Sequence, residues 1–394
     1  MNRLDLSGAA LADPYPVLAD LRAEGPLVPS DGVLLATTRE SCDAVLRDRR
    51  LGRIFAPRQP EAEWETFNWL HADSVLDSEP PKHTRLRRLV AAAFGRGHVA
   101  RLAPRIQALC DELLEPAGPA LGDGTWDVVT SYAEPLPVLV IAELLDWPVA
   151  DRHLLRPWSQ AIVKMYELAP TEEQQQEARK AASEFAEYVA ALADSRVGGD
   201  GEDLLSDLVR VRDGSDRLSR TELVATVVLL LNAGHEASVN GFGNGLASLL
   251  AAPGQQAAAR DAVQDPAQAA LLVEEMLRHD PPLQYFERTA TQDVELLGRT
   301  VHEGERVAAL LGAAAHDPAA YDDPDTFRSA RTGPPHLGFG AGIHFCLGAP
   351  LARLELQTSI STLLGRTSHL EVVSQVRRPT FVLRGYESLV LADA

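Results

Sequence analysis

Residues 339–348 (FGAGIHFCLG) decide the fold of this 394-residue chain. Cys346 lies there among three glycines, and a helix-like run, APLARLELQTSISTLLG (residues 349–365), follows at once. Glycine allows positive φ and a close approach of the backbone to a flat group. A thiol at the start of a helix meets backbone N–H groups and the positive end of the helix dipole, which favour the thiolate. The pattern is typical of an iron ligand, whereas a cysteine without this context is usually just buried.

The stretch resembles the haem-binding loop of the cytochrome P450 family, Phe-x-x-Gly-x-x-x-Cys-x-Gly. Phe339, Gly342, Cys346 and Gly348 fill that pattern without a gap. The resemblance extends over roughly residues 12–392. It implies one domain over residues 1–394, mainly α with minor β, in which haem b (iron protoporphyrin IX) lies between a long central helix and the cysteine loop. Cys346 would be the axial thiolate and sole protein ligand of the metal. Phe339 would pack beside the sulfur, and Gly348 would belong to the same cofactor-binding loop.

The central helix is expected at residues 220–252, where the helix signal is strongest. Its hydrophobicity on all sides (LVATVVLLLNAG) predicts a buried position. Residues 52–79, which carry several prolines and aromatic residues, are expected to be a long irregular loop; in the family this region closes over the substrate. Further helices are expected at 14–23, 39–47, 99–116, 132–147, 172–195 and 271–279, and strands at 32–38, 293–297, 299–308 and 380–391.

Residues 233–238 (AGHEAS) resemble the family's oxygen-binding motif, Ala-Gly-x-Glu/Asp-Thr-Thr/Ser. Ala233 and Ala237 are four residues apart, so they share one small helix face. By residue type alone, such a stripe of small residues is also typical of helix packing. The resemblance implies a catalytic group made of Gly234, Glu236, Ala237 and Ser238.

Ala237 departs from the motif, because the family has threonine at this place. The resemblance implies that its hydroxyl helps to deliver protons during oxygen activation, which is a general-acid task. Ser238 points about 100° away around the helix and cannot simply replace it. Three explanations remain open: a substrate hydroxyl completes the relay, ordered water does so, or the reaction needs less proton control.

Haem propionates are anionic and need cationic partners. Four residues match the family positions for that role, although each by itself would more often be a surface charge: His83, Arg87, Arg288 and His344. Glu275 and Arg278 resemble the family's Glu-x-x-Arg and lie on one helix face. With Arg331 they are expected to form a buried structural group that supports the haem loop.

The distal pocket implied by the family layout is lined by Asn232, Ala233, Leu283, Gln284, Phe286 and Phe381, and by parts of residues 56–76 and 160–180. This mixture of apolar and polar surface suits a medium-sized, partly apolar metabolite. A role in secondary metabolism is suggested by analogy with small members of the family.

The net charge of −19 disfavours nucleic acid and anionic membranes as partners. No long apolar run or signal-peptide region is apparent, and Cys42, Cys110 and Cys346 are too widely separated for a disulfide framework. A cytoplasmic monomer is therefore expected. One segment is basic, with Lys82, Arg85, Arg87, Arg88, Arg96, Arg101 and Arg105 and no acidic residue between Pro80 and Cys110. It is either a solvated helix face or a docking site for an acidic ferredoxin, and docking predicts reduction rates that fall with salt.

The chain has no dinucleotide fingerprint, because the glycines at 241–245 lie within the expected helix. Electrons are therefore expected from a ferredoxin and its ferredoxin reductase, unless peroxide is used. The expected enzyme is an oxidoreductase that hydroxylates or epoxidises a small molecule with O₂. Oxidative coupling or desaturation on the same scaffold, and a non-catalytic haem-binding partner protein, remain as alternatives. Zinc binding is disfavoured because His344 and Cys346 have no second cysteine nearby.

Overall fold

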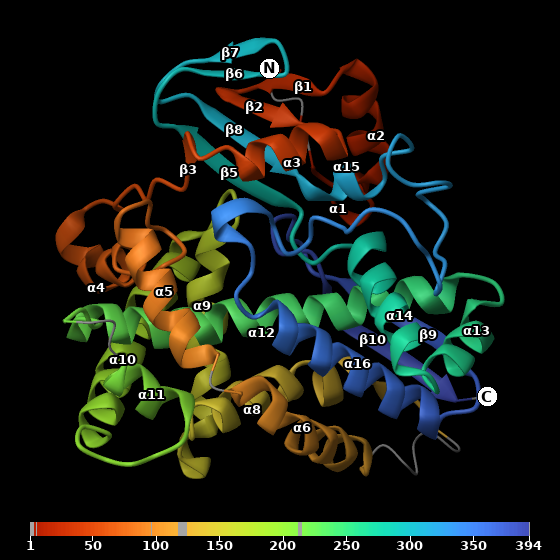
Figure 1. Cartoon of the computed structure of the whole chain (residues 1–394). Coiled ribbons are helices and arrows are strands. Elements are labelled where there is room, and N and C mark those ends of the chain that lie inside the picture. The colour runs from red at the N-terminus through yellow and green to blue at the C-terminus, as the bar shows by residue number, and fades with distance from the viewer. Residues whose placement is uncertain (1–3, 5, 96, 117–123, 212–214, 394) are drawn as a thin grey trace. The chain divides into compact units, whose positions relative to one another are not determined.

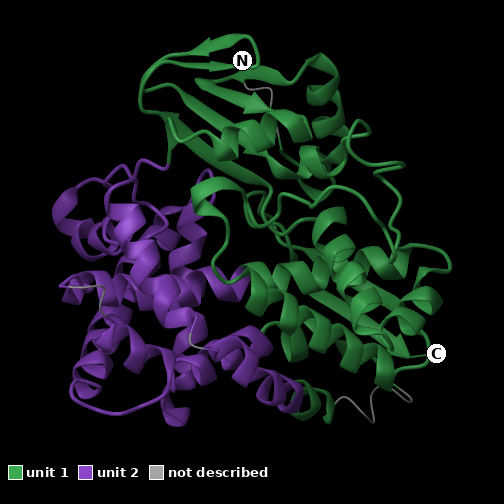
Figure 2. Cartoon of the chain, in the orientation of Figure 1, with its two compact units in different colours: residues 1–52, 110–134, 237–394 green, residues 53–109, 135–236 purple. Residues whose placement is uncertain are grey.

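The computed structural model describes residues 4, 6–95, 97–116, 124–211 and 215–393 (Figure 1). Helices dominate it and the sheets are small, which confirms the expected mainly α fold with minor β. The chain divides into two units (Figure 2). Unit 1 comprises residues 1–52, 110–134 and 237–394, and unit 2 comprises residues 53–109 and 135–236. That the chain acts as one domain stays a prediction.

A five-stranded sheet forms one part of unit 1. Its strand order is β1 (Leu27–Ser30), β2 (Val33–Ala36), β8 (Arg306–Leu310), β5 (Tyr285–Ala290) and β3 (Leu51–Gly52), and only β2 and β8 pair in parallel. Alternate residues of β2 enter two apolar clusters, because successive strand side chains point to opposite faces. Leu34 packs with residues of α3 (Arg39–Arg47), and Leu35 with residues of α2 (Tyr15–Glu24).

The rest of unit 1 is mostly helical. Helix α14 (Pro266–His279) packs on α13 (Gln255–Ala262) and α16 (Ala349–Arg366). The smaller elements are α1 (Ala9–Ala12), α15 (Leu311–Ala315), η1 (Val129–Ala133), the hairpin β6 (Val294–Leu296) and β7 (Arg299–Val301), and a sheet of β4 (Trp126–Asp127), β10 (Tyr386–Asp393) and β9 (Leu370–Arg377).

Unit 2 is built from helices. Helix α9 (Leu155–Val163) packs on α10 (Glu172–Ser195), where the Trp158 and Phe185 rings stack 5.1 Å apart. Thr171 caps α10 through a reciprocal capping box with Gln174. The other elements are α4 (Glu61–Ala72), α5 (Lys82–Phe94), α6 (His98–Leu114, whose last residues belong to unit 1), α8 (Pro135–Leu144), η2 (Val149–Leu154), η3 (Lys164–Tyr166) and α11 (Leu204–Arg210).

The predicted central helix is α12 (Arg220–Ala251), which carries the chain from unit 2 into unit 1. Among the described residues it alone is long and apolar enough to cross a membrane by length and composition. However, 72% of its apolar window is buried inside the protein, which is the pattern of a core helix.

The expectation of one irregular loop over residues 52–79 is wrong, because α4 lies within it. Trp64, Phe67 and His71 are three and four residues apart, so they share one helix face, and all three are buried. The sequence therefore contained the spacing of a helix, but the prolines around it led to the prediction of a loop.

Several strand boundaries also differ from expectation. The run at 299–308 is two strands, β7 and β8, separated by a turn at Gly304 with φ +83°. The run at 380–391 becomes strand only from Tyr386, and its partner β9 was not expected. Most of β9 is exposed on both faces, so it lacks the alternation that marks a half-buried strand.

Candidate active site

The cysteine loop folds back so that Cys346 lies beside the residue with which the loop begins. The Cys346 N–H donates to the Phe339 carbonyl at 2.9 Å, and the Phe345 N–H donates to the Gly342 carbonyl at 3.2 Å. A short 3-10 turn, η4 (Gly342–His344), forms the middle of the loop. Cys346 itself is half-buried and lies three residues before α16 begins. A partly accessible thiol is thus held at the start of a helix by backbone hydrogen bonds.

Gly342 is essential to this arrangement. Its φ is +67°, and a Cβ added there would lie 2.5 Å from the carbonyl oxygen of Leu46 at the end of α3. Gly340 also has positive φ, +70°, and lies against the Phe286 ring. Both glycines provide the backbone freedom that the sequence pattern predicted.

An ion pair holds the Phe339 ring from one side. The Arg353 guanidinium lies 4.5 Å from the ring centroid. Two hydrogen bonds, of 2.6 and 2.9 Å, join Arg353 to Glu274 on α14. Burial would raise the pKa of Glu274, but hydrogen bonds from Arg353 and His336 lower it to about 2, so the carboxylate stays charged. Sequence reasoning missed this pair, because its members are 79 residues apart.

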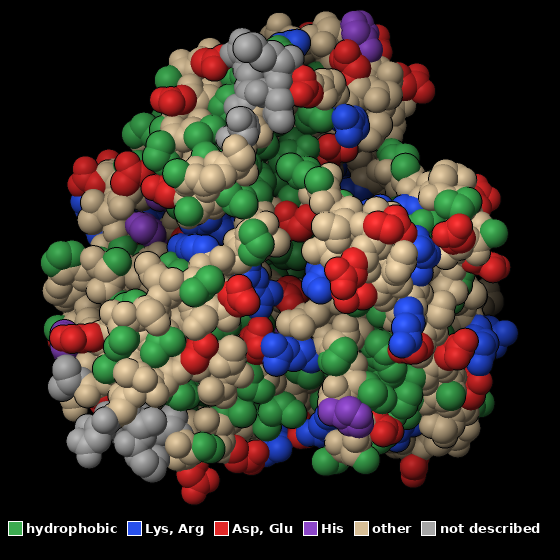
Figure 3. Space-filling model, turned by 180° about the vertical axis from the view of Figure 1, so that it is seen from behind, with side chains coloured by type: hydrophobic (Ala, Val, Ile, Leu, Met, Phe, Trp, Pro, Cys, Tyr) green, Lys and Arg blue, Asp and Glu red, His purple; other side chains and the backbone are tan. Residues whose placement is uncertain are grey.

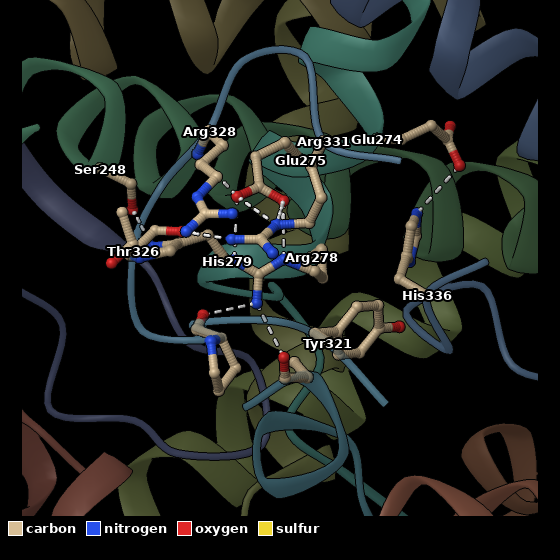
Figure 4. Close-up of polar contacts among 12 residues, drawn as sticks. Ser248, Glu274, Glu275, Arg278, His279, Tyr321, Thr326, Arg328, Arg331 and His336 are labelled. Atoms are coloured by element: carbon tan, nitrogen blue, oxygen red, sulfur yellow. Dashed lines mark hydrogen bonds and ion pairs between the residues drawn. The ribbon is translucent and has the colours of Figure 1, made fainter. Parts of the chain in front are cut away.

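Figure 4 shows the predicted group of Glu275, Arg278 and Arg331, with Glu274 and its contact to His336 in the same view. Arg278 binds Glu275 through two hydrogen bonds, of 2.7 and 2.9 Å, and Arg331 Nε lies 3.0 Å from both carboxylate oxygens. The side chains of Glu275 and Arg278 are 0% and 3% exposed. Arg278 also donates to the carbonyls of Ala315 and Pro324. The group therefore ties α14 to the chain on both sides of residues 316–323.

The motif in α12 presents its residues to different neighbours. Ala233 is exposed, whereas Asn232 and Glu236 are buried. A Cβ added to Gly234 would lie 3.0 Å from the Ile141 side chain of α8, and His235 Nδ1 lies 3.3 Å from the Ser159 hydroxyl of α9. Gly234 therefore permits close helix packing, and its expected catalytic role stays a prediction. Ala237 and Ser238 follow on α12 at the beginning of its unit 1 part.

The four residues expected to contact haem propionates come from both units. His83 is buried and Arg87 half-buried, one turn apart on α5 in unit 2. Arg288, on β5 of unit 1, is 3% exposed, and its Nη1 donates to the Glu287 carbonyl at 2.9 Å. His344 lies in η4, two residues before the cysteine.

Comparison with known proteins decides the family. The cytochrome P450 family pattern matches residues 142–382, more than half of the chain. The chain is 40% identical to cytochrome P450 monooxygenase PikC of Streptomyces venezuelae, over 96% of this chain and 90% of that protein. It is 37% identical to mycinamicin IV hydroxylase/epoxidase of Micromonospora griseorubida, over 92% of this chain and 89% of that protein. The crystal structure of P450BioI with a fatty-acyl acyl carrier protein superimposes with a TM-score of 0.91 at 31% identity, covering 98% of this chain and 99% of that one.

The chain belongs to the cytochrome P450 family. It is a cytochrome P450 monooxygenase, and the family's cofactor is a thiolate-bound haem. The residues present fit such a group. The loop keeps the Cys346 thiol partly accessible, and Gly348 carries no side chain beside it, since a Cβ added there would lie 3.9 Å from Cys346 Sγ.

Two of the residues expected in this P450's substrate pocket lie in the core of unit 1 instead. Gln284 is 0% exposed, and its Nε2 donates to the Pro281 carbonyl at 2.8 Å. Gly312 leaves the space that the Gln284 carboxamide occupies, since an added Cβ there would lie 1.9 Å from Oε1. Phe381 packs in the apolar cluster that contains Leu18. These positions do not support a pocket role for Gln284 or Phe381.

Leu283 and Phe286 are only partly buried and pack against the apolar cluster that contains Leu34. Leu283 pairs with Leu383 in an isolated antiparallel bridge. The backbone hydrogen bonds on either side of this bridge, Gln284 N to Val382 O and Arg384 N to Pro282 O, are 3.1 and 2.9 Å long. The segments at 282–284 and 382–384 are therefore held together within unit 1.

A buried ionic cluster, which the sequence did not reveal, fixes those two segments. Asp280 is 3% exposed and accepts hydrogen bonds from Arg384 at 2.9 Å, Arg377 at 2.7 Å and the Tyr15 hydroxyl at 2.6 Å. Burial would raise the pKa of Asp280, but the charges of Arg377 and Arg384 lower it. The cluster joins the end of α14 to β9 and to the residues before β10.

The basic segment is neutralised within unit 2 more than the sequence suggested. Lys82 contacts Asp73 at 2.6 Å, Arg85 contacts Glu222 and Asp216, and Arg105 contacts Glu143 at 3.1 Å. Arg88 lies 3.8 Å from Asp216, and Arg96 is outside the described residues. On the face drawn in Figure 3, basic side chains likewise lie interspersed with acidic ones. These pairs weaken the expectation of a strongly positive docking site.

Proposed function

We propose that this P450 inserts one oxygen atom of O₂ into a C–H bond or double bond of a medium-sized, partly apolar secondary metabolite. The single observation that carries the proposal is the geometry of residues 339–348, which holds the Cys346 thiol at the start of α16. The names of the relatives, a monooxygenase and a hydroxylase/epoxidase, support this class of reaction.

In this proposal Cys346 binds the iron of haem b, and the haem supplies the site of oxygen activation. His83, Arg87, Arg288 and His344 neutralise the propionates. The Glu274–Arg353 pair and the Glu275–Arg278–Arg331 group hold the surroundings of Phe339 and the cysteine loop. Ala233, Asn232, Leu283 and Phe286 remain candidates for the substrate pocket.

Among the residues expected to be catalytic in the oxygen-binding motif, Glu236 and Ser238 have side chains that can carry protons. Because Ala237 has no hydroxyl, a substrate hydroxyl together with water is proposed to complete the relay. Ala237 also favours a second candidate function, oxidative coupling or desaturation without oxygen insertion, which needs less proton delivery.

Electrons are proposed to come from a ferredoxin and its reductase, with the enzyme acting as a cytoplasmic monomer. The glycine-rich residues 241–245 lie inside α12 and therefore do not form a dinucleotide fingerprint. This supports separate proteins as the source of electrons.

The first experiment tests the thiolate ligand. After reduction and addition of CO, the absorption spectrum of the wild type is expected to show the red-shifted Soret band of a thiolate-bound haem. Cys346→Ser should lose that band, whereas the matched control Cys42→Ser, at a buried cysteine in α3, should keep it. A wild type without the band would refute the assignment of Cys346.

The second experiment separates the reactions by turnover of candidate metabolites under ¹⁸O₂ with a surrogate ferredoxin pair. Label in the product supports hydroxylation or epoxidation. Coupled or dehydrogenated product without label would replace that proposal by the second candidate function. An intact Soret band without any consumption of O₂ would point to a non-catalytic haem protein.

A further inference from the structure

Glu355 on α16 is a buried carboxyl group without a hydrogen-bond or ion-pair partner in the described part of the chain. The residue is 5% exposed, and burial alone raises its pKa to about 8. By contrast, the buried carboxylates Asp280 and Glu275 each bind two arginine side chains. A buried carboxyl group that lacks a cation favours its neutral form, because ionisation would place an uncompensated charge in the interior.

Two titratable side chains next to this part of α16 stay neutral. Burial raises the pKa of the Cys110 thiol to about 12, and a charge on Glu355 adds to this rise, so the two groups are neighbours. The Tyr132 hydroxyl donates to the Ser359 carbonyl, one turn after Glu355, at 2.9 Å. Burial holds the pKa of Tyr132 well above its usual value of 10.0. Neither side chain therefore supplies a charge that would stabilise the Glu355 carboxylate.

The charged side chains that contact α16 from α6, α13 and α14 are bound to other groups. Arg353, two residues before Glu355, points about 200° away from it around the helix. These charged groups are Asp111 with Arg366, Glu274 with Arg353, and Arg260, which binds the carbonyls of Leu364 and Thr367.

The backbone of Cys346 leads directly into α16. The Ala349 N–H donates to the Cys346 carbonyl at 3.5 Å, which begins the helical turn. Glu355 follows Cys346 by nine positions, or about 14 Å at 1.5 Å per residue. Glu274 chiefly raises the pKa of Arg353, and the charge of Cys346 adds to this rise, so the field of the sulfur reaches α16.

Reduction of a haem bound to Cys346 adds one negative charge at about that distance from Glu355. With an effective dielectric constant of about 20, two unit charges about 14 Å apart change each other's affinity for a proton or an electron about tenfold. The Glu355 carboxylate should thus bind a proton about ten times more tightly in the reduced enzyme.

We propose that Glu355 is a proton-binding site coupled to reduction of the haem. One electron from an iron–sulfur protein reduces the iron, and one proton from solvent binds the Glu355 carboxylate and forms its O–H bond. The added electron is thereby compensated within unit 1. The inference rests on the proposed binding of haem to Cys346, and it adds a proton to the electron that this haem takes up.

The test compares the reduction potential of the haem in the wild type and in Glu355→Gln as the pH is varied. Glutamine has the shape of the protonated acid but cannot ionise. Near about pH 6 the two potentials should nearly coincide, because both side chains are neutral there. Toward about pH 10 the wild-type potential should fall about 59 mV further than that of the variant, which is the one-electron equivalent of a tenfold change. Glu371→Gln on β9, whose side chain is 62% exposed, is the control and should follow the wild type.

Proton uptake on reduction is a second, independent measurement, made with a pH indicator dye under CO at about pH 8.5. The pKa of Glu355, about 8 in the oxidised enzyme, should be about 9 in the reduced one. The wild type should therefore take up about half a proton more per haem than Glu355→Gln. If Glu355→Gln fails to fold, Glu355→Met replaces it in both measurements.

Parallel potential profiles for the wild type and Glu355→Gln would overturn the proposal, and so would equal proton uptake. Glu355 would then be a buried acid that affects stability alone. Both of these outcomes are obtained with the thiolate Soret band intact, so they leave the proposed function standing. A wild type that lacks this band would instead refute the proposed function itself.

Discussion

The cysteine loop depends on a backbone angle that glycine alone adopts without strain. Gly342→Ala is expected to destabilise the protein by more than the roughly 1–3 kcal/mol of an unfavourable backbone conformation, because its Cβ also meets the Leu46 carbonyl. Thermal unfolding and haem content of the purified variant measure the effect.

Gly365→Ala, near the end of α16, is the matched control, because nothing lies within 4 Å of its added Cβ. Alanine is the better helix former, so this variant should be as stable as the wild type or slightly more so. If both variants retained full haem content and wild-type stability, the loop would not depend on Gly342.

Glu355 on α16 makes stability depend on pH in the direction opposite to that of most carboxyl groups. Burial raises its pKa from 4.5 to about 8. Between these values the folded protein keeps the proton that the unfolded chain releases, so the free energy of unfolding falls as pH rises from about 4.5 to 8. The loss should be on the order of 3–5 kcal/mol, and Glu355→Gln should remove it.

Unfolding midpoints measured across this pH range test the assignment. Glu371→Gln on β9, where the side chain is 62% exposed, should leave the pH dependence unchanged. Parallel pH profiles for the wild type and Glu355→Gln would contradict the raised pKa.

At the residue level, the sequence predicted best what a short motif encodes. Cys346 and its glycines lie within ten residues of one another, and Glu275 and Arg278 within one helical turn, so spacing alone relates them. Gln284 was misjudged because its burial depends on space left by Gly312, in an element whose position the local sequence does not specify.

Among contacts between elements, the Asp280 cluster is the clearest test of stability. Asp280→Asn would leave Arg377 and Arg384 next to a neutral amide in a buried site. Breaking a buried ion pair in this way costs about 3–5 kcal/mol, which should lower the unfolding midpoint by several degrees.

Asp293→Asn serves as the comparison, since that carboxylate is 64% exposed beside His302. Exposed pairs contribute about 0–1 kcal/mol, so its midpoint should barely change. Equal midpoints for both variants would show that the Asp280 cluster adds nothing to stability.

Helices were predictable where one face, or every face, of the helix is buried, because either case leaves a clear hydrophobic pattern in the sequence. The core helix α12 and the amphipathic α10 match their predicted ranges closely. Helix α4 was missed because its flanking prolines suggested a loop, and β9 because its exposed faces give no periodic signal.

For the whole molecule, the net charge of −19 and the pairing of the basic segment's cations with acidic residues change the expected salt dependence of reduction by ferredoxin. The rate is no longer expected to fall with salt. Reduction by an acidic ferredoxin should stay level or become faster between about 10 and 150 mM salt, as the Debye length shrinks from roughly 30 to 8 Å. Stopped-flow reduction under CO measures this rate.

Arg88, whose side chain is 57% exposed, is the position at which to test whether ferredoxin docks on the basic segment after all. Two results together would restore the basic segment as the docking site. The wild-type rate of reduction would fall steeply with salt, and at low salt Arg88→Gln would be reduced more slowly than the wild type. An unchanged rate in this variant would agree with internal neutralisation.

The path of the chain between the two units limits how this enzyme can be recombined with its relatives. The chain crosses between units at 52/53, 109/110, 134/135 and 236/237, so neither unit is a continuous stretch that can be exchanged as a cassette. Two of these crossings fall inside helices, in α6 and α12, and the last separates Glu236 from Ala237. A chimera joined there would combine halves of the oxygen-binding motif from different parents. Crossovers at 52/53 and 134/135, outside helices, are therefore the better sites for building libraries of hybrid enzymes.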